Sequence, residues 1–185
     1  MPPIAVPVLV RSSPWLAVAP ALGLLVLTGC GGGPDVRFAP TCPQLKLLAN
    51  GADLTRVRGQ GTDLTDMVLQ ARITGVPASC NDGGRNTVRA TINVLIDGTR
   101  GPAAATRAFQ LPYLVTVTLG EQPIDQKLFV AQLNFPANVD RTSVAGEDVI
   151  LSFPVTPERA ASAYTIYVSF RLTGDELAAN RRVKR

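Results

Sequence analysis

The side chains that could perform chemistry in this chain are carboxylates, lysines and cysteines, because its 185 residues include no histidine. A Ser-His-Asp triad, a Cys-His pair and the common histidine-bearing metal sites are therefore excluded. A Ser-Lys dyad would need Lys46 or Lys127 buried beside a serine, and neither lies in a recognisable motif. Glu147 and Asp148 fall in a glycine-containing turn, which favours a solvated hairpin tip over a glycosidase pair. We predict no catalytic residue, no metal ligand and no cofactor.

A short acidic repeat is the one remaining candidate for a reactive cluster. The pattern Asp-Leu-Thr occurs within residues 52–55 and again within residues 62–65. Asp53, Asp63 and Asp66 could form a carboxylate cluster for calcium binding or acid-base work. The alternative is that each aspartate opens a turn that leads into a strand. We favour the turns, because the spacing of a full calcium loop is missing.

Cys30 has a different sequence context from the other two cysteines. A Leu-Thr-Gly-Cys box, residues 27–30, stands at the end of an apolar run, residues 16–27, with Arg11 upstream. The run is too short and too broken by proline to span a membrane. This arrangement resembles bacterial lipoprotein signal peptides, whose box holds an aliphatic residue, a small residue, Gly or Ala, and then the modified cysteine. The alternative is a short N-terminal anchor with an incidental cysteine.

The lipoprotein resemblance implies a cleaved signal peptide, residues 1–29, and a diacylglycerol thioether plus an N-acyl chain on Cys30. Two or more acyl chains hold a protein stably to a bilayer, whereas one chain does so only marginally. Residues 30–40 begin with three glycines and Pro34, which indicates a flexible tether. Resemblance to the sorting preference of enteric bacteria implies the periplasmic face of the outer membrane, because position 31 is not acidic. The inner membrane is the alternative.

Cys42 and Cys80 remain once Cys30 is acylated, and export would place them in an oxidising compartment. We therefore predict a disulfide between them. Two thiols alone do not make a closed zinc site.

The charge of the chain does not indicate nucleic-acid binding. The net charge is +4, and it falls to about +3 when the signal peptide, with Arg11 as its one charged residue, is removed. Much of the excess lies in a C-terminal cluster, Arg181, Arg182, Lys184 and Arg185. Such a cluster is usually a solvated tail, and contact with anionic lipid or cell wall is the alternative.

Along the rest of the chain, apolar residues alternate with polar ones at a period of two, which is typical of half-buried strands. Six strands are predicted from this pattern, and a seventh could lie near residues 54–58. Pro112 suggests an edge or a bulge near the start of one strand. The apolar positions of the six strands are Met67, Leu69, Ala71 and Ile73; Val88, Ala90, Ile92, Val94 and Ile96; Phe109, Leu111, Tyr113, Val115 and Val117; Phe129, Ala131, Leu133 and Phe135; Val149, Leu151 and Phe153; and Tyr164, Ile166, Val168, Phe170 and Leu172.

Turn residues rather than helical stretches follow each strand, which excludes parallel βαβ units. We predict an all-β domain over residues 41–172, an antiparallel immunoglobulin-like β-sandwich, with a small β-barrel as the alternative. Thr173 and Glu176 have the spacing of a capping box. Residues 173–185 are therefore expected to form a short C-terminal helix and a basic tail.

Six short motifs together resemble a group of small, uncharacterised proteobacterial envelope lipoproteins. The resemblance spans nearly all of the mature chain and implies an envelope location and a β-rich domain, but it brings no catalytic residue. The motifs are Cys42-Pro43, Asp63-Leu64-Thr65-Asp66, Ala71-Arg72-Ile73-Thr74-Gly75, Gly101-Pro102-Ala103-Ala104, Pro112-Tyr113-Leu114-Val115 and Glu176-Leu177-Ala178-Ala179-Asn180-Arg181.

Three functional hypotheses follow. The first is a membrane-anchored accessory or scaffold, not an enzyme, that binds another envelope protein through a sheet edge or an exposed face. The second is a carrier of a small apolar ligand, lined by the aromatic side chains. The third is a histidine-independent hydrolase. We favour the first hypothesis.

Overall fold

The computed structural model describes residues 40–59, 61 and 63–183. The predicted signal peptide, Cys30 and most of the predicted tether lie outside the described residues, as do Lys184 and Arg185. The described chain is mostly β-structure with two short 3-10 turns and one helix, α1 (Gly174–Val183). Its strands are β1 (Gln44–Leu47), β2 (Asp53–Val57), β3 (Met67–Gly75), β4 (Ala78–Asp82), β5 (Thr87–Ile92), β6 (Leu95–Arg100), β7 (Ala108–Leu119), β8 (Gln122–Asn134), β9 (Arg141–Ala145), β10 (Val149–Pro154) and β11 (Tyr164–Phe170).

The first layer of the fold is a four-stranded sheet in the order β1-β11-β7-β8. β7 and β8 form a long hairpin, and β11 pairs antiparallel with the other side of β7. β1 is parallel to β11, so this layer is not wholly antiparallel. The outer strands of the layer are β1 and β8.

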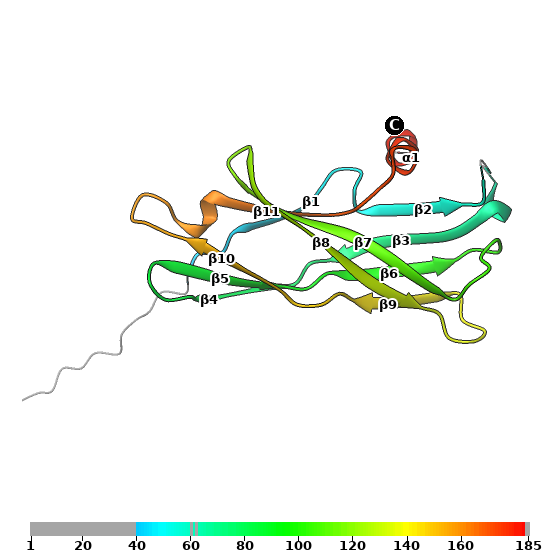
Figure 1. Ribbon diagram of the computed structural model, residues 1–185, viewed down its shortest axis with the longest axis horizontal. Coiled ribbons are helices and arrows are strands. Elements are labelled where there is room, and N and C mark those ends of the chain that lie inside the picture. Colours follow the sequence, from blue (N-terminus) through cyan, green and yellow to red (C-terminus); the bar gives the residue numbers. More distant parts are fainter. Residues whose placement is uncertain (1–39, 60, 62, 184–185) are drawn as a thin grey trace, which may run out of the picture. The chain divides into compact units, whose positions relative to one another are not determined.

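The second layer consists of two sheets that continue one another, in the orders β2-β3-β6-β9 and β10-β5-β4 (Figure 1). Three chain segments pass from one sheet into the other: β3 into β4, β5 into β6, and β9 into β10. Backbone hydrogen bonds bridge the junction, from Asn93 N to Pro77 O at 3.0 Å and from Gly146 N to Val94 O at 2.8 Å. We therefore treat the two sheets as the halves of one layer.

The apolar faces of the two layers meet in one hydrophobic core, to which each of the six predicted strands contributes most of its alternating residues; Met67 and Val88 lie outside this cluster. Gly98 of β6 leaves room for a side chain of the facing layer, because an added Cβ there would overlap the side chain of Leu133 on β8. The predicted all-β sandwich with a short C-terminal helix is confirmed. Among the described residues neither layer closes on itself, so the small barrel is not the architecture observed.

The strand that contains Pro112 is central, and its register shift lies between Val117 and Thr118, so the prediction of an edge or a bulge at Pro112 is wrong. β7 lies between β11 and β8. The last β11–β7 pair is Phe170 with Tyr113, and the next residue, Arg171, donates its backbone N–H to Pro112 O at 2.9 Å. Pro112 therefore faces the β11 side just where β11 ends. A missing N–H costs little at that position, because no ladder bond is lost.

The predicted capping box begins α1. Thr173 N donates to a Glu176 carboxylate oxygen at 2.7 Å, and Glu176 N donates to Thr173 Oγ1 at 3.2 Å. The buried Asn180 amide donates to Asp53 O at 2.6 Å and to Asn50 O at 2.9 Å. The helix is thereby held against the backbone of β2 and of the turn before it.

Candidate functional site

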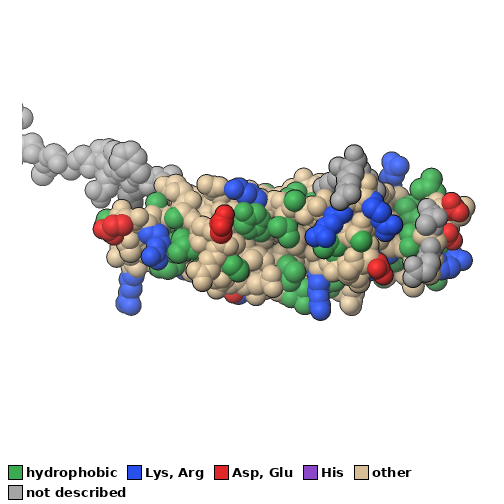
Figure 2. Space-filling view, turned by 90° about the horizontal axis from the view of Figure 1, so that it is seen from above, with side chains coloured by type: hydrophobic (Ala, Val, Ile, Leu, Met, Phe, Trp, Pro, Cys, Tyr) green, Lys and Arg blue, Asp and Glu red, His purple; other side chains and the backbone are tan. Residues whose placement is uncertain are grey.

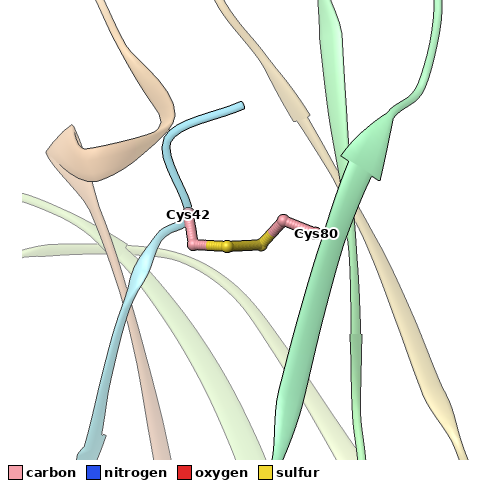
Figure 3. The surroundings of a disulfide bond; sticks show 2 residues. All are labelled: Cys42 and Cys80. Atoms are coloured by element: carbon pink, nitrogen blue, oxygen red, sulfur yellow. A yellow bond between two sulfur atoms is a disulfide. The ribbon is translucent and has the colours of Figure 1, made fainter. Parts of the chain in front are cut away.

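The two cysteines predicted to pair are joined in a disulfide (Figure 3). Cys42 lies just before β1, an outer strand of the first layer, and Cys80 lies on β4, an outer strand of the second. Their Cα atoms are 5.8 Å apart, and 38 positions separate them in sequence. The disulfide therefore links the two layers along one side of the sandwich. This role is structural.

The acidic repeat is placed as the turn interpretation expects. Asp53 is the first residue of β2 and bonds to the Arg72 guanidinium with an Nε–Oδ1 distance of 2.6 Å. Asp63 is exposed and precedes a 3-10 turn (Leu64–Asp66) that leads into β3. Among the described residues no group of three or more His, Cys, Asp or Glu side chains could hold a metal ion.

The acidic pair Glu147 and Asp148 lies between β9 and β10, at the junction of the second layer. Asp148 accepts a hydrogen bond from the Asn93 amide at 3.0 Å. Burial, and secondarily the negative charge of Glu147, raise the pKa of Tyr113 above its usual value. The Tyr113 hydroxyl is buried and has no hydrogen-bond partner in the described structure. A buried neutral phenol facing a glycine, Gly146, is no acid-base machinery.

The two lysines of the described chain lie on the surface, and most of the aromatic side chains pack in the core. Lys46 is exposed on β1, and Lys127 is half-exposed beside Asp125. Aromatic side chains pack on one another in the core: the rings of Tyr113 and Phe129 stack with centroids 5.5 Å apart, and those of Phe153 and Tyr164 lie 5.1 Å apart. The rings of Tyr113 and Phe129 fill the core, whereas those of Phe153 and Tyr164 also form part of the floor of a cleft between β8 and β10.

The outer strands of both layers expose backbone groups that another chain could bind, unless something covers them. α1 lies against β2, where the Asn180 amide binds Asp53 O, and β4 has only five residues, with Cys80 of the disulfide at its centre. β9 lies against β8 near the connection between them. β1 has only four residues, and β10 has only six, with Pro154 at its end. β8 has thirteen residues, and residues 122–130 of it pair with β7 alone, with a register shift that leaves Ile124 without a partner on β7.

The hydrogen-bonding direction along β8 follows from the contact of Pro112. Because Pro112 O faces Arg171 on the β11 side, the C=O group of Pro112 and the N–H and C=O groups of alternate residues after it along β7 point away from β8. Pro112, Leu114 and Thr116 are paired with Val130, Leu128 and Gln126. The backbone groups of these three β8 residues therefore point away from β7. The unpaired backbone N–H and C=O groups of these three residues form the open edge of the sheet.

A cleft of about 330 Å³ runs beside this open edge, between β8 and β10. Its rim carries Ile124 and Ile150, which are 52% and 60% exposed. Asp125 and Lys127 also line the cleft, with Nζ and Oδ2 3.7 Å apart. The cleft floor is apolar core, formed by Val117, Leu151, Phe153 and Tyr164. The side of the sandwich opposite the disulfide is therefore open and partly apolar.

The surface around the open edge carries further apolar side chains. Leu128 and Val130 are 48% and 45% exposed on β8. Figure 2 shows hydrophobic side chains scattered between charged side chains of both signs on the face seen there. Arg181 and Arg182 are exposed on α1, whose first turn is acidic, so its charge is mixed.

The sequence patterns did not identify the open edge, because residues 122–128 show no apolar alternation. A tight hairpin could have indicated it, since Leu119 pairs with Gln122 across Gly120 and Glu121. A two-residue hairpin turn forces the residues after it to extend along the preceding strand.

No helix in the described part of the chain is long and apolar enough to cross a membrane. No family model matches the chain, and neither a curated protein nor a solved structure is significantly similar to it.

Proposed function

We propose that this protein is a lipoprotein anchored through acylated Cys30 on the periplasmic face of the outer membrane. In that position it acts as an accessory or scaffold module that binds an envelope protein. The anchor rests on the resemblance of residues 1–30 to a lipoprotein signal peptide. The binding role rests on one observation, the open edge of β8, where the backbone N–H and C=O groups of Gln126, Leu128 and Val130 point away from β7.

Strand addition is the binding mode that this edge supports best. An extended segment beside residues 126–130 would satisfy the outward N–H and C=O groups and continue the sheet. Each backbone hydrogen bond contributes about 1 kcal/mol net, and Leu128 and Val130 add apolar contact. The resulting affinity is modest. Anchoring both partners in one membrane raises their effective concentration and makes a modest affinity sufficient.

Site-specific photocrosslinking in intact cells tests the proposal. A photoreactive amino acid at Val130, on the open edge, should form an adduct with an envelope protein. The matched control position is Arg89, which is exposed on β5, a central strand with neighbours on both sides. Absence of an adduct at Val130, or equal adducts at Val130 and Arg89, would refute the edge as the binding site.

A backbone variant separates strand addition from side-chain contact. Leu128→Pro removes an N–H that points away from β7, so it should abolish the Val130 adduct while the sheet stays paired. Leu128→Thr keeps the N–H and should keep the adduct. Phe129→Pro removes an N–H that bonds to β7 and should destabilise the fold. If Leu128→Pro unfolds the protein as Phe129→Pro does, the assigned direction of the edge is wrong.

A further inference from the structure

The centre of the open edge has a pattern that is complementary to itself. Asp125 and Lys127 flank Gln126, carry opposite charges and line the same cleft. When two copies of an antiparallel strand pair about a two-fold axis through one residue, the residues before and after that axis face each other. With the axis at Gln126, Asp125 of each copy lies directly opposite Lys127 of the other.

We propose that the strand added to β8 is β8 of a second copy of this chain, paired antiparallel about Gln126. This inference rests on the proposed function and names its partner. The Gln126 backbone groups point outward, so the two copies exchange a pair of hydrogen bonds at the axis. The two sheets of four strands become one continuous sheet.

Charge selects this register over its neighbours. An axis at Asp125 or at Lys127 would place two like charges directly opposite each other, which is destabilising. An axis at Leu128 would place Asp125 opposite Ala131. Neither Asp125 nor Lys127 would then face a charged residue on the other strand. Only the Gln126 register forms two ion pairs across the interface.

Burial favours the pairing as well. In the single chain, Asp125 and Lys127 are each about half exposed, so their own ion pair contributes little. A second strand beside β8 covers the mouth of the cleft and its rim residues Ile124 and Ile150. It thereby shields the charges from water and removes exposed apolar surface, which strengthens both interactions.

Cysteine crosslinking of the full lipoprotein in its own membrane tests the register. Gln126→Cys places the new thiol at the axis, where the Cα atoms of a hydrogen-bonded pair are about 5.5 Å apart, within disulfide range. We expect a covalent dimer. Leu128→Cys is the matched control, because Leu128 lies opposite residue 124 and its two copies are about 14 Å apart. Efficient crosslinking of Leu128→Cys, or none at either position, would overturn the proposal.

A charge swap tests the complementarity. Asp125→Lys and Lys127→Asp each oppose like charges twice in the dimer, and each should weaken dimerisation by at least about tenfold. The double variant Asp125→Lys/Lys127→Asp restores opposite charges and should recover the dimer. Glu121→Lys, at the hairpin turn outside the paired residues, is the control. Sedimentation of the detergent-solubilised lipoprotein measures each dissociation constant. Failure of the double variant to recover dimerisation overturns the ion pairs.

The two proposals fail differently. If the Val130 adduct contains another envelope protein and the purified lipoprotein stays monomeric, the second copy is wrong and strand addition at β8 stands. An adduct of twice the chain mass supports both proposals. Absence of both adduct and dimer refutes both.

Discussion

Removing the disulfide should cost this sandwich a large part of its stability. The perturbation is Cys42→Ser, Cys80→Ser, or both. In the chain-entropy model, a closed loop of 38 residues corresponds to about 4 kcal/mol at 25 °C. For a domain of this size that loss lowers the melting temperature by about 10 °C. The disulfide also holds the outer strands β1 and β4 together, so their loosening should be the first local consequence.

Urea unfolding of the purified, disulfide-bonded protein, followed by far-UV circular dichroism, measures the loss. Each single Ser variant should lose the same free energy of unfolding as the double variant, because either substitution alone opens the loop. A reductant should lower the wild type to that level and leave all three variants unchanged. Additive losses of the two single variants, or an unchanged wild type after reduction, would refute the reasoning.

Four further predictions concern single positions. Gly101→Ala should destabilise the fold by about 3 kcal/mol, measured by urea unfolding, because a Cβ there overlaps the backbone carbonyl of Met67. The control is Gly174→Ala, which should be neutral or stabilising because nothing lies near its Cβ. Tyr113→Phe should raise the free energy of unfolding at pH 7 by up to about 1 kcal/mol, because it removes an unpartnered buried hydroxyl. The pKa of Tyr113 is raised in the folded protein, so wild-type stability falls once the pH exceeds the unfolded value near 10. The variant should lack that alkaline loss. Asn180→Ala should cost about 2 kcal/mol and speed amide exchange in α1, because two backbone carbonyls lose their donor. Cys30→Ser should abolish labelling with a palmitate analogue and leave an uncut precursor; normal labelling would remove the lipoprotein proposal.

The strands with one buried face could be predicted from the sequence, because alternation directly reflects burial. Val88, Ala90, Ile92, Val94 and Ile96 are all buried, as predicted. The pattern continues through the junction of β5 and β6, so the sequence indicates one strand where the hydrogen bonding divides it into two.

The strands that sequence patterns missed are those whose two faces are both largely exposed. β1, β4 and β9 carry few buried side chains, and so does the first half of β8. Without a buried face there is no alternation to detect. These strands form because their backbone groups pair with a neighbour, and that neighbour is distant in sequence for β1, whose partner is β11.

The same limit applies to the candidate site. Whether a strand is an edge depends on what lies beside it in the fold, as the central position of Pro112 on β7 shows. The roles of Cys42 and Cys80 could be predicted, because cysteine pairing needs only a count of thiols and an oxidising compartment. The open edge of β8 could not, because it is defined by the absence of a neighbour after every strand is placed.

The charges on β8 fit two opposed functions, and the geometry distinguishes them. Charged side chains beside an edge commonly prevent aggregation, since a strand that places like charges or an apolar face against them pairs poorly. A single charged side chain would hinder pairing with any partner strand in the same way. Asp125 and Lys127, placed symmetrically about Gln126, disfavour most registers and satisfy one, that of a second copy. The same two residues therefore exclude general strand pairing and specify the pairing that we propose.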